Sequence, residues 1–264
     1  MSSEPKLAES LIHPTAIVEE GAVIGKNVRI GPHSWIRENV VIGDDCVIGA
    51  NVVIEGWTTI GRGCTVYHSA VVGAPPQDLK YRGDRSYVEI GDHNVIREFV
   101  TINLATSPEG VTRIGDHNLL MAYVHVAHEC EIGNHTIIAN AVNLAGHVSV
   151  EDYATIGGVT PVHQFVRVGA HSFIGGGSRV AKDVPPFVLA AGNPIRVGGI
   201  NVVGLTRRGF ESDVKSHLIR AYKILFRSDR NTSQAMAAIR AEIPMTPEVE
   251  RFVQFIESSE RGII

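Results

Sequence analysis

The sequence predicts a mainly β fold, a parallel β-helix built from hexapeptide repeats and followed by a small α-helical domain. Isoleucine, valine or leucine recurs every six residues from Ile12 to Val180, at 26 of the 29 positions of that spacing. We call these core positions. Glycine often follows a core position, and the last part of the chain changes to helical periodicity. A period of six fits neither an α-helix nor a coiled coil, and is typical of short-repeat β solenoids.

Three hexapeptides would form one triangular coil of 18 residues, so that core positions 18 residues apart stack on each other. Each buried aliphatic side chain contributes about 1.5–3 kcal/mol, and the repeat is long enough for about nine to ten coils. The glycine after a core position, such as Gly25 or Gly31, is expected to turn the corner, because glycine tolerates backbone conformations that a side chain forbids.

The three core positions without an aliphatic residue are Asp78, Asp84 and Pro108. They lie in polar segments that contain proline or glycine, so we expect loops at 73–87 and 103–113. Loops of this size on a compact body usually serve function.

The end of the repeat divides the chain into a β-helix domain, residues 1–190, and a C-terminal helical domain, residues 191–264. The glycine-rich segment 187–209 is expected to be irregular. Three amphipathic helices should follow it, with Ser212 as N-cap of the first, residues 232–242 as the second and Thr246 as N-cap of the third.

The net charge of −4 does not favour nucleic acid as a partner. The charge is uneven, with nine Lys/Arg and three Asp/Glu between Arg196 and Arg240. This basic segment indicates an anionic ligand or partner, or simply a solvated helical face.

Cysteine content and hydropathy bear on location. The three cysteines are widely spaced, which favours free thiols in a reducing compartment. The N-terminus has no apolar signal region and no stretch reaches 18 apolar residues, so we expect a cytoplasmic protein without stable membrane insertion.

Seven of the twelve histidines lie between His117 and His171. Coil spacing stacks the core positions at residues 126, 144 and 162, so the residues two places further on share a column. The predicted patch therefore contains His125, His128, Gly146, His147, His163 and Gln164.

Two chemistries suit this patch. A neutral histidine can take a proton from a hydroxyl that attacks a carbonyl, while a glycine N–H stabilises the oxyanion. Three histidines can instead bind Zn²⁺ and activate water. The periodicity is compatible with both.

The chain resembles the acyl-(acyl carrier protein)–UDP-N-acetylglucosamine O-acyltransferase family of lipid A biosynthesis over nearly its whole length. The resemblance rests on QDLKY (Gln77–Tyr81), VHVAHECEIGN (Val124–Asn134), NLAGHVSVEDYATIGG (Asn143–Gly158), VHQFVRVGAH (Val162–His171), DVPPFV (Asp183–Val188), the GN of Gly192-Asn193 and NVVGLTRRGF (Asn201–Phe210).

The resemblance implies a left-handed helix, an exception to the right-handed crossover rule. It also implies a homotrimer with active sites between subunits, and neither a metal nor a cofactor. The reaction would move a 3-hydroxyacyl group from acyl carrier protein, a small acidic protein, to the 3-hydroxyl of UDP-N-acetylglucosamine.

The resemblance also assigns roles to residues. His128 matches the general base, and the N–H of Gly146 matches the oxyanion donor. Glu129, where the family commonly has Asp, is expected to help orient the base. Gly176 matches the position that measures acyl length. The other matched substrate-binding positions are Gln77, Asp78, Lys80, His125, His147, His163, Gln164, Asn201 and Arg207.

Two positions depart from the family pattern, Asn103 in TINLAT and Val203 in NVVGL. Because of these departures, the sugar nucleotide that accepts the acyl group could carry a 3-amino group in place of the 3-hydroxyl. The N-acyltransferase of the same pathway is an alternative within this class, although it carries a separate N-terminal domain. The remaining alternatives are a β-helical zinc carbonic anhydrase, which metal analysis would identify, and a non-enzymatic scaffold, which would leave the histidine patch without a purpose.

Overall fold

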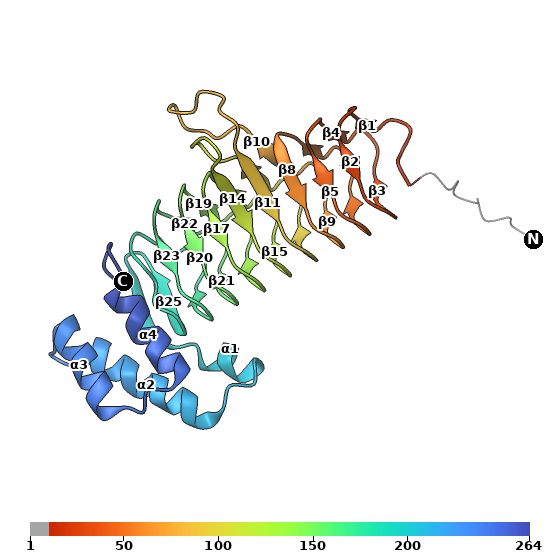
Figure 1. The fold of residues 1–264 in the computed structure, drawn as a ribbon. Helices are drawn as coiled ribbons and strands as arrows, with labels where there is room; N and C mark the ends of the chain where they lie inside the picture. Colours follow the sequence, from red (N-terminus) through yellow and green to blue (C-terminus); the bar gives the residue numbers. More distant parts are fainter. Residues whose placement is uncertain (1–10) are drawn as a thin grey trace, which may run out of the picture.

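The computed structural model describes residues 11–264 and shows a long prism with a group of helices at one end (Figure 1). Three sheets form its walls, and from β1 to β24 consecutive strands belong to different sheets. Sheet 1 contains β1 (Ile17–Val18), β4 (Trp35–Ile36), β7 (Val53–Ile54), β10 (Val71–Ala74), β13 (Thr101–Asn103), β16 (His125–Val126), β19 (Asn143–Leu144) and β22 (Pro161–Val162). Sheet 2 contains β2 (Val23–Ile24), β5 (Val41–Ile42), β8 (Trp57–Ile60), β11 (Tyr87–Ile90), β14 (Val111–Ile114), β17 (Glu131–Ile132), β20 (Ser149–Val150) and β23 (Arg167–Val168). Sheet 3 contains β3 (Arg29–Ile30), β6 (Val47–Ile48), β9 (Thr65–Val66), β12 (Val95–Ile96), β15 (Leu119–Leu120), β18 (Ile137–Ile138), β21 (Thr155–Ile156), β24 (Phe173–Ile174), β25 (Val188–Gly192) and β26 (Ile195–Ile200).

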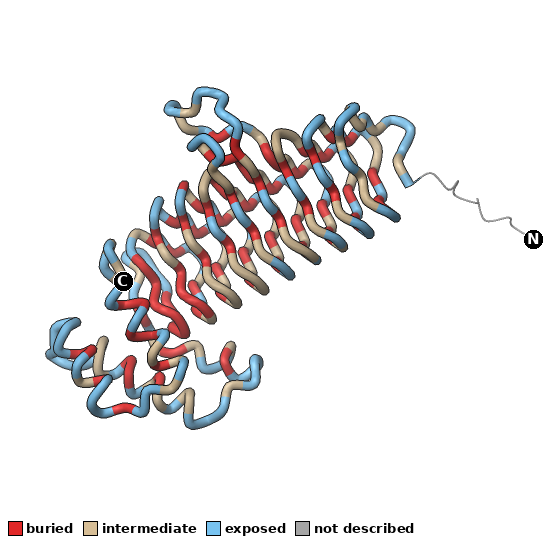
Figure 2. Tube along the Cα trace, in the orientation of Figure 1, coloured by how far each residue is buried: buried red, intermediate tan, exposed pale blue. Residues whose placement is uncertain are grey.

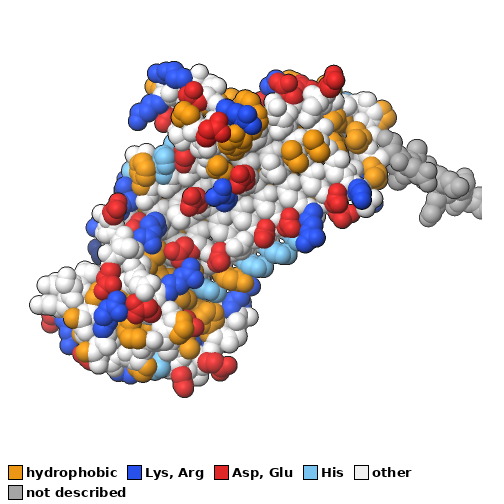
Figure 3. Space-filling model, in the orientation of Figure 1, with side chains coloured by type: hydrophobic (Ala, Val, Ile, Leu, Met, Phe, Trp, Pro, Cys, Tyr) orange, Lys and Arg blue, Asp and Glu red, His pale blue; other side chains and the backbone are white. Residues whose placement is uncertain are grey.

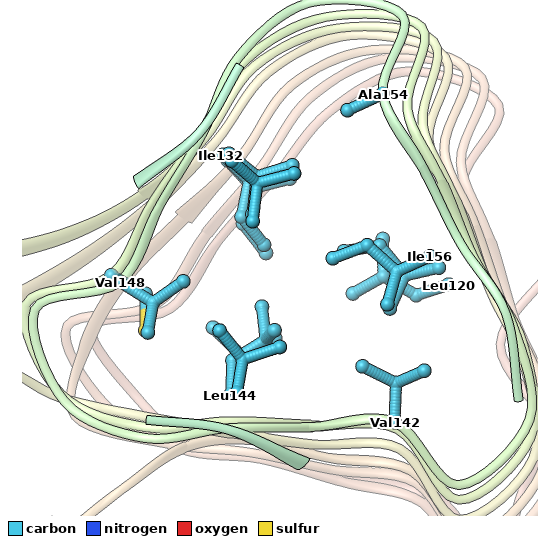
Figure 4. Packing of buried hydrophobic residues seen from close by; sticks show 14 of the residues in the cluster. Leu120, Ile132, Val142, Leu144, Val148, Ala154 and Ile156 are labelled. Carbon is cyan, nitrogen blue, oxygen red and sulfur yellow. The ribbon is translucent and has the colours of Figure 1, made fainter. Parts of the chain in front are cut away.

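The core positions fill the prism, as predicted. Every aliphatic core position from Ile30 to Val180 is buried, and buried residues recur regularly along the coils (Figure 2). Leu144, Ile132 and Ile156 point inward from the three walls into one core (Figure 4). The parallel pairing is in register, because each uninterrupted coil advances the chain by 18 residues.

The predicted role of the glycines at the corners is wrong. Positive φ angles fall three residues after the core positions, at residues such as Asn27 (φ 56°) and Asn39 (φ 65°). The glycine directly after a core position is instead needed for space. A Cβ on Gly31 would lie 2.7 Å from the carbonyl carbon of Gly49 on the next coil. The glycines therefore allow adjacent coils to approach closely.

Two loops leave the coil on the same side of the prism (Figure 1). They span residues 75–86, between β10 and β11, and 104–110, between β13 and β14. Both are shorter than predicted because Ala74 still pairs with Asn103 on the adjacent strand. The Ser86 Oγ donates a hydrogen bond to the Ala105 carbonyl at 2.7 Å, which links the two loops.

The segment 187–209 is regular, contrary to the prediction. β25 pairs in parallel with β24, and β26 pairs antiparallel with β25. Four helices follow: α1 (Val202–Arg207), α2 (Ser212–Phe226), α3 (Thr232–Glu242) and α4 (Pro247–Glu257).

The helix ends follow local capping chemistry. The N-cap of α2 is Glu211 rather than the predicted Ser212, which is already helical. Asn231 and Gln234 form a capping box on α3, and Thr246 caps α4 as predicted. The chain then returns to the prism, where Ile263 bridges to Asp183. Within residues 11–264, no helix combines the length and apolarity that crossing a membrane requires.

Candidate active site

The histidine patch lies at the edge between sheets 1 and 2. Parallel register aligns Val126 with Leu144, and Leu144 with Val162. The His147 N–H donates to the His128 carbonyl at 3.0 Å, and the Phe165 N–H donates to the Gly146 carbonyl at 3.1 Å. Figure 3 shows that histidine side chains gather at more than one edge of the prism, but only this edge lies beside the two loops.

Glu129 fixes the orientation of His128. Its Oε2 lies 2.5 Å from His128 Nδ1. Burial raises the pKa of Glu129, but hydrogen bonds from Ser107, Thr106 and His128 outweigh burial and lower that pKa to about 2. An ionised carboxylate can only accept hydrogen bonds, so Nδ1 of His128 carries the proton. In the neutral imidazole with this tautomer, Nε2 is the acceptor, which is the form a general base requires.

Gly146 stands directly beside the imidazole of His128. A Cβ at this position would lie 2.6 Å from His128 Nε2, so no side chain fits while the imidazole keeps its place. Within residues 11–264, the Gly146 N–H donates no hydrogen bond. A free N–H next to a general base is available to an oxyanion, provided that the reacting carbonyl lies between them.

Other predicted residues surround His128. Asp78 on the 75–86 loop places Oδ2 3.8 Å from His128 Nε2. The His147 ring meets the His128 ring edge-on, with 5.3 Å between centroids. The half-buried His125 pairs through Nδ1 with Thr101 Oγ1 at 2.7 Å, and burial together with the charge of His128 lowers the pKa of His125.

The remaining neighbours are exposed. Gln77 and Lys80 lie on the 75–86 loop, and His163 and Gln164 lie on the coil beyond Gly146. The His163 Nδ1 lies 3.2 Å from a guanidinium nitrogen of Arg261, near the end of the chain. These side chains therefore line the open side of the patch.

Three predicted residues lie elsewhere in this chain. Asn201 and Arg207 line a cavity of about 480 Å³ with Tyr153 and His171, at the edge between sheets 2 and 3. Gly176 follows β24 of sheet 3, at the edge between sheets 3 and 1. A single chain thus distributes the predicted site residues over all three edges of its prism.

The closest pair of atoms in the patch does not have the spacing of two metal ligands. His128, Glu129 and His147 can bring three ligand atoms within 4.8 Å of one another. However, His128 Nδ1 and Glu129 Oε2 are 2.5 Å apart, whereas two ligands of a tetrahedral zinc ion lie about 3.3 Å apart. The pair is therefore a hydrogen bond, and the arrangement favours the acid–base alternative.

Sequence reasoning missed Thr106, Ser107 and Arg261. The first two contact Glu129 across 22 to 23 residues of sequence, and Arg261 contacts His163 across 98 residues. These contacts follow from the way the loop and the C-terminal tail fold back, and no local motif signals them.

The chain matches models of known families. Residues 183–264 match the second domain of UDP-N-acetylglucosamine O-acyltransferase. Residues 39–74 and 112–146 match the bacterial transferase hexapeptide repeat.

Full-length relatives are similar over almost the entire chain. An acyl-(acyl-carrier-protein)–UDP-N-acetylglucosamine O-acyltransferase of Thiobacillus denitrificans is 50% identical over 96% of this chain and 98% of its own length. The corresponding protein of Chlamydia abortus is 49% identical over 96% of this chain and 91% of its own length.

Solved structures agree. A UDP-N-acetylglucosamine acyltransferase from Bacteroides fragilis superposes with a TM-score of 0.93 at 46% identity, covering 96% of this chain and 99% of that chain. The Arabidopsis enzyme gives 0.83 at 36% identity, with 96% and 99% covered. Superposition preserves hand, so the coil is the left-handed β-helix that the resemblance implied. The chain belongs to the acyl-(acyl carrier protein)–UDP-N-acetylglucosamine O-acyltransferase family.

Proposed function

We propose that the protein transfers a (3R)-3-hydroxyacyl group from acyl carrier protein to the 3-hydroxyl of UDP-N-acetylglucosamine, the first step of lipid A biosynthesis. The observation that carries the proposal is the free Nε2 of His128 beside the unpaired N–H of Gly146. The names of the relatives supply the substrates, and the patch supplies groups suited to acyl transfer.

The chemistry needs one base and one oxyanion donor. His128 Nε2 takes the proton of the sugar 3-hydroxyl as its oxygen attacks the thioester carbonyl. The Gly146 N–H stabilises the negative charge on the carbonyl oxygen. When the C–S bond breaks, the imidazolium returns the proton to the leaving thiolate. The products are the 3-O-acyl sugar nucleotide and the free thiol of the carrier.

The surrounding residues are proposed to hold the substrates. Gln77, Asp78, Lys80, His125, His147, His163 and Gln164 would contact the sugar and the acyl donor. Asn201 and Arg207 would contact the nucleotide, and Val203 and Arg208 line the same cavity. The three cysteines are free and buried, which supports a reducing compartment, and we propose the cytoplasm.

The proposed function is tested with a purified-protein assay. Acyl carrier proteins bearing 3-hydroxyacyl chains of several lengths are offered with UDP-N-acetylglucosamine or with its 3-amino analogue. We expect an ester at the 3-oxygen and release of free carrier thiol. A larger kcat/KM with the amino analogue would show that the enzyme forms an amide at a 3-amino group instead of an ester. If no donor gives acyl transfer, the proposal is overturned.

We propose that the active enzyme is a homotrimer whose sites combine edges of adjacent copies, because no single chain brings Arg207 near His128. Mixing His128→Ala and Arg207→Ala chains, each inactive alone, should restore activity in about a quarter of the sites of randomly mixed trimers. Light scattering verifies that mixed trimers form. Mixed trimers without any gain in activity would place the whole site within one chain.

Gly176 is proposed to limit the length of the acyl chain. A Cβ at Gly176 would lie 3.1 Å from the Gly158 carbonyl oxygen, so a side chain fits after a small shift. We expect Gly176→Met to move the preference towards shorter acyl chains by a graded amount, because one methylene is worth only about 1–3 kcal/mol. The measurement is kcat/KM across the donor series. An unchanged profile in a folded variant would remove Gly176 from this role.

A further inference from the structure

We propose that Thr106 and Ser107, on the 104–110 loop, are positioning residues for the general base. They act through Glu129 and not by touching substrate. The inference rests on the proposed function, because it assigns a task to these residues only if His128 is the base. It adds that the reactive orientation of His128 depends on a loop that precedes it by about one coil.

The hydrogen bonds to Glu129 are unusually concentrated. Its Oε1 accepts from the Thr106 N–H at 2.8 Å and the Thr106 Oγ1 at 2.8 Å. The same oxygen accepts from the Ser107 N–H at 2.9 Å and the Ser107 Oγ at 2.9 Å. Two consecutive residues thus direct four donors at one oxygen.

In this arrangement the two carboxylate oxygens of Glu129 have different hydrogen-bond partners. Oε1 is saturated by the loop, so Oε2 is left to face His128 Nδ1. The donors also keep the carboxylate ionised, since each one favours the charged form. The Glu129 main chain is held separately, because its N–H donates to Thr112 Oγ1 at 2.9 Å. With both ends held, the side chain cannot swing away from the imidazole.

The loop itself is anchored to the opposite side of the patch. The Glu109 N–H donates to the Arg85 carbonyl at 2.7 Å, and Ser86 Oγ donates to the Ala105 carbonyl at 2.7 Å. The 75–86 loop carries Asp78, which approaches Nε2 of His128. One nitrogen of the imidazole is therefore faced by Asp78 of the 75–86 loop, and the other by Glu129, which the adjoining 104–110 loop holds.

The test removes the two hydroxyls and leaves the two backbone donors. Thr106→Val and Ser107→Ala are made singly and together, in the parent and in a Glu129→Ala background, which removes the acceptor of both hydroxyls. We expect the double variant to lower kcat about tenfold, with little change in KM for the nucleotide sugar, because orientation of the base affects the chemical step. Thr106→Ser, which retains a hydroxyl, should restore most of the rate.

The decisive result is a double-mutant cycle. If the hydroxyls act through Glu129, their removal should lower kcat by less than twofold when Glu129 is already Ala. An equal tenfold loss in both backgrounds would overturn the proposal, as would parent-like kcat in the folded double variant. Melting temperature and light scattering establish that each variant is folded. If the double variant does not fold, the same comparison is made with the two single substitutions.

A matched control loosens the same loop without touching the carboxylate. Tyr87→Phe removes the hydrogen bond from the Tyr87 hydroxyl to Glu109 Oε2, 2.7 Å long. It should leave kcat within about twofold of the parent. A tenfold loss here would show a nonspecific effect of loop mobility and overturn the proposal. His128→Ala is assayed in parallel: if it stays active, the proposed function fails, and if only the hydroxyl variants stay active, this inference alone fails.

Discussion

Replacing His128 with alanine should lower kcat by about 10²–10⁴, the usual contribution of a general base. The imidazole is the group whose free Nε2 stands beside the Gly146 N–H, and Glu129 cannot replace it because its pKa of about 2 leaves it a poor proton acceptor at neutral pH. Binding of the nucleotide sugar should change much less. Steady-state kinetics with a saturating acyl donor gives both values.

The matched control is His93→Ala. His93 is exposed and stacks on His117 at the edge between sheets 2 and 3, which is a different edge from that of the patch. Its removal should leave kcat unchanged within about twofold. A correctly folded His128→Ala variant with near-parent turnover would refute the role of His128 as the base.

Gly146→Ala should lower kcat by about 10²-fold, because a displacement of the base of about 1 Å has an effect of that order. The new Cβ would overlap the imidazole, which must rotate or move away from the Gly146 N–H. The hydrogen bond between His128 Nδ1 and Glu129 would be strained by the same movement. The substitution thus changes both the base and the oxyanion donor.

Gly199→Ala is the control for this substitution, because a Cβ at Gly199 meets nothing within 4 Å. It should retain parent kcat and parent melting temperature. If Gly146→Ala keeps the parent rate while folded, the contact between Gly146 and His128 does not constrain catalysis.

The local repeat determined the architecture. The six-residue spacing of aliphatic residues was enough to predict stacked triangular coils. Each coil makes the same contacts with the coils next to it, and these contacts do not depend on segments distant in the sequence. The same arithmetic placed His128, Gly146 and Gln164 in one column. It could not assign the corner conformation, because glycine next to a core position is required by the approach of the next coil, as at Gly31.

The tertiary structure decided what the repeat does not encode. The loop containing Thr106 and Ser107 interrupts the period, so its path towards Glu129 depends on long-range hydrogen bonds that no spacing predicts. The segment of Gly192 and Ile195 joins sheet 3 as β25 and β26 because the free edge of β24 offers unpaired backbone groups. The sequence by itself determined the column that contains His128 and Gly146. Only the folded chain decided how the His128 ring is oriented and which of the predicted site residues lie on separate edges, because both depend on segments brought together across interruptions of the repeat.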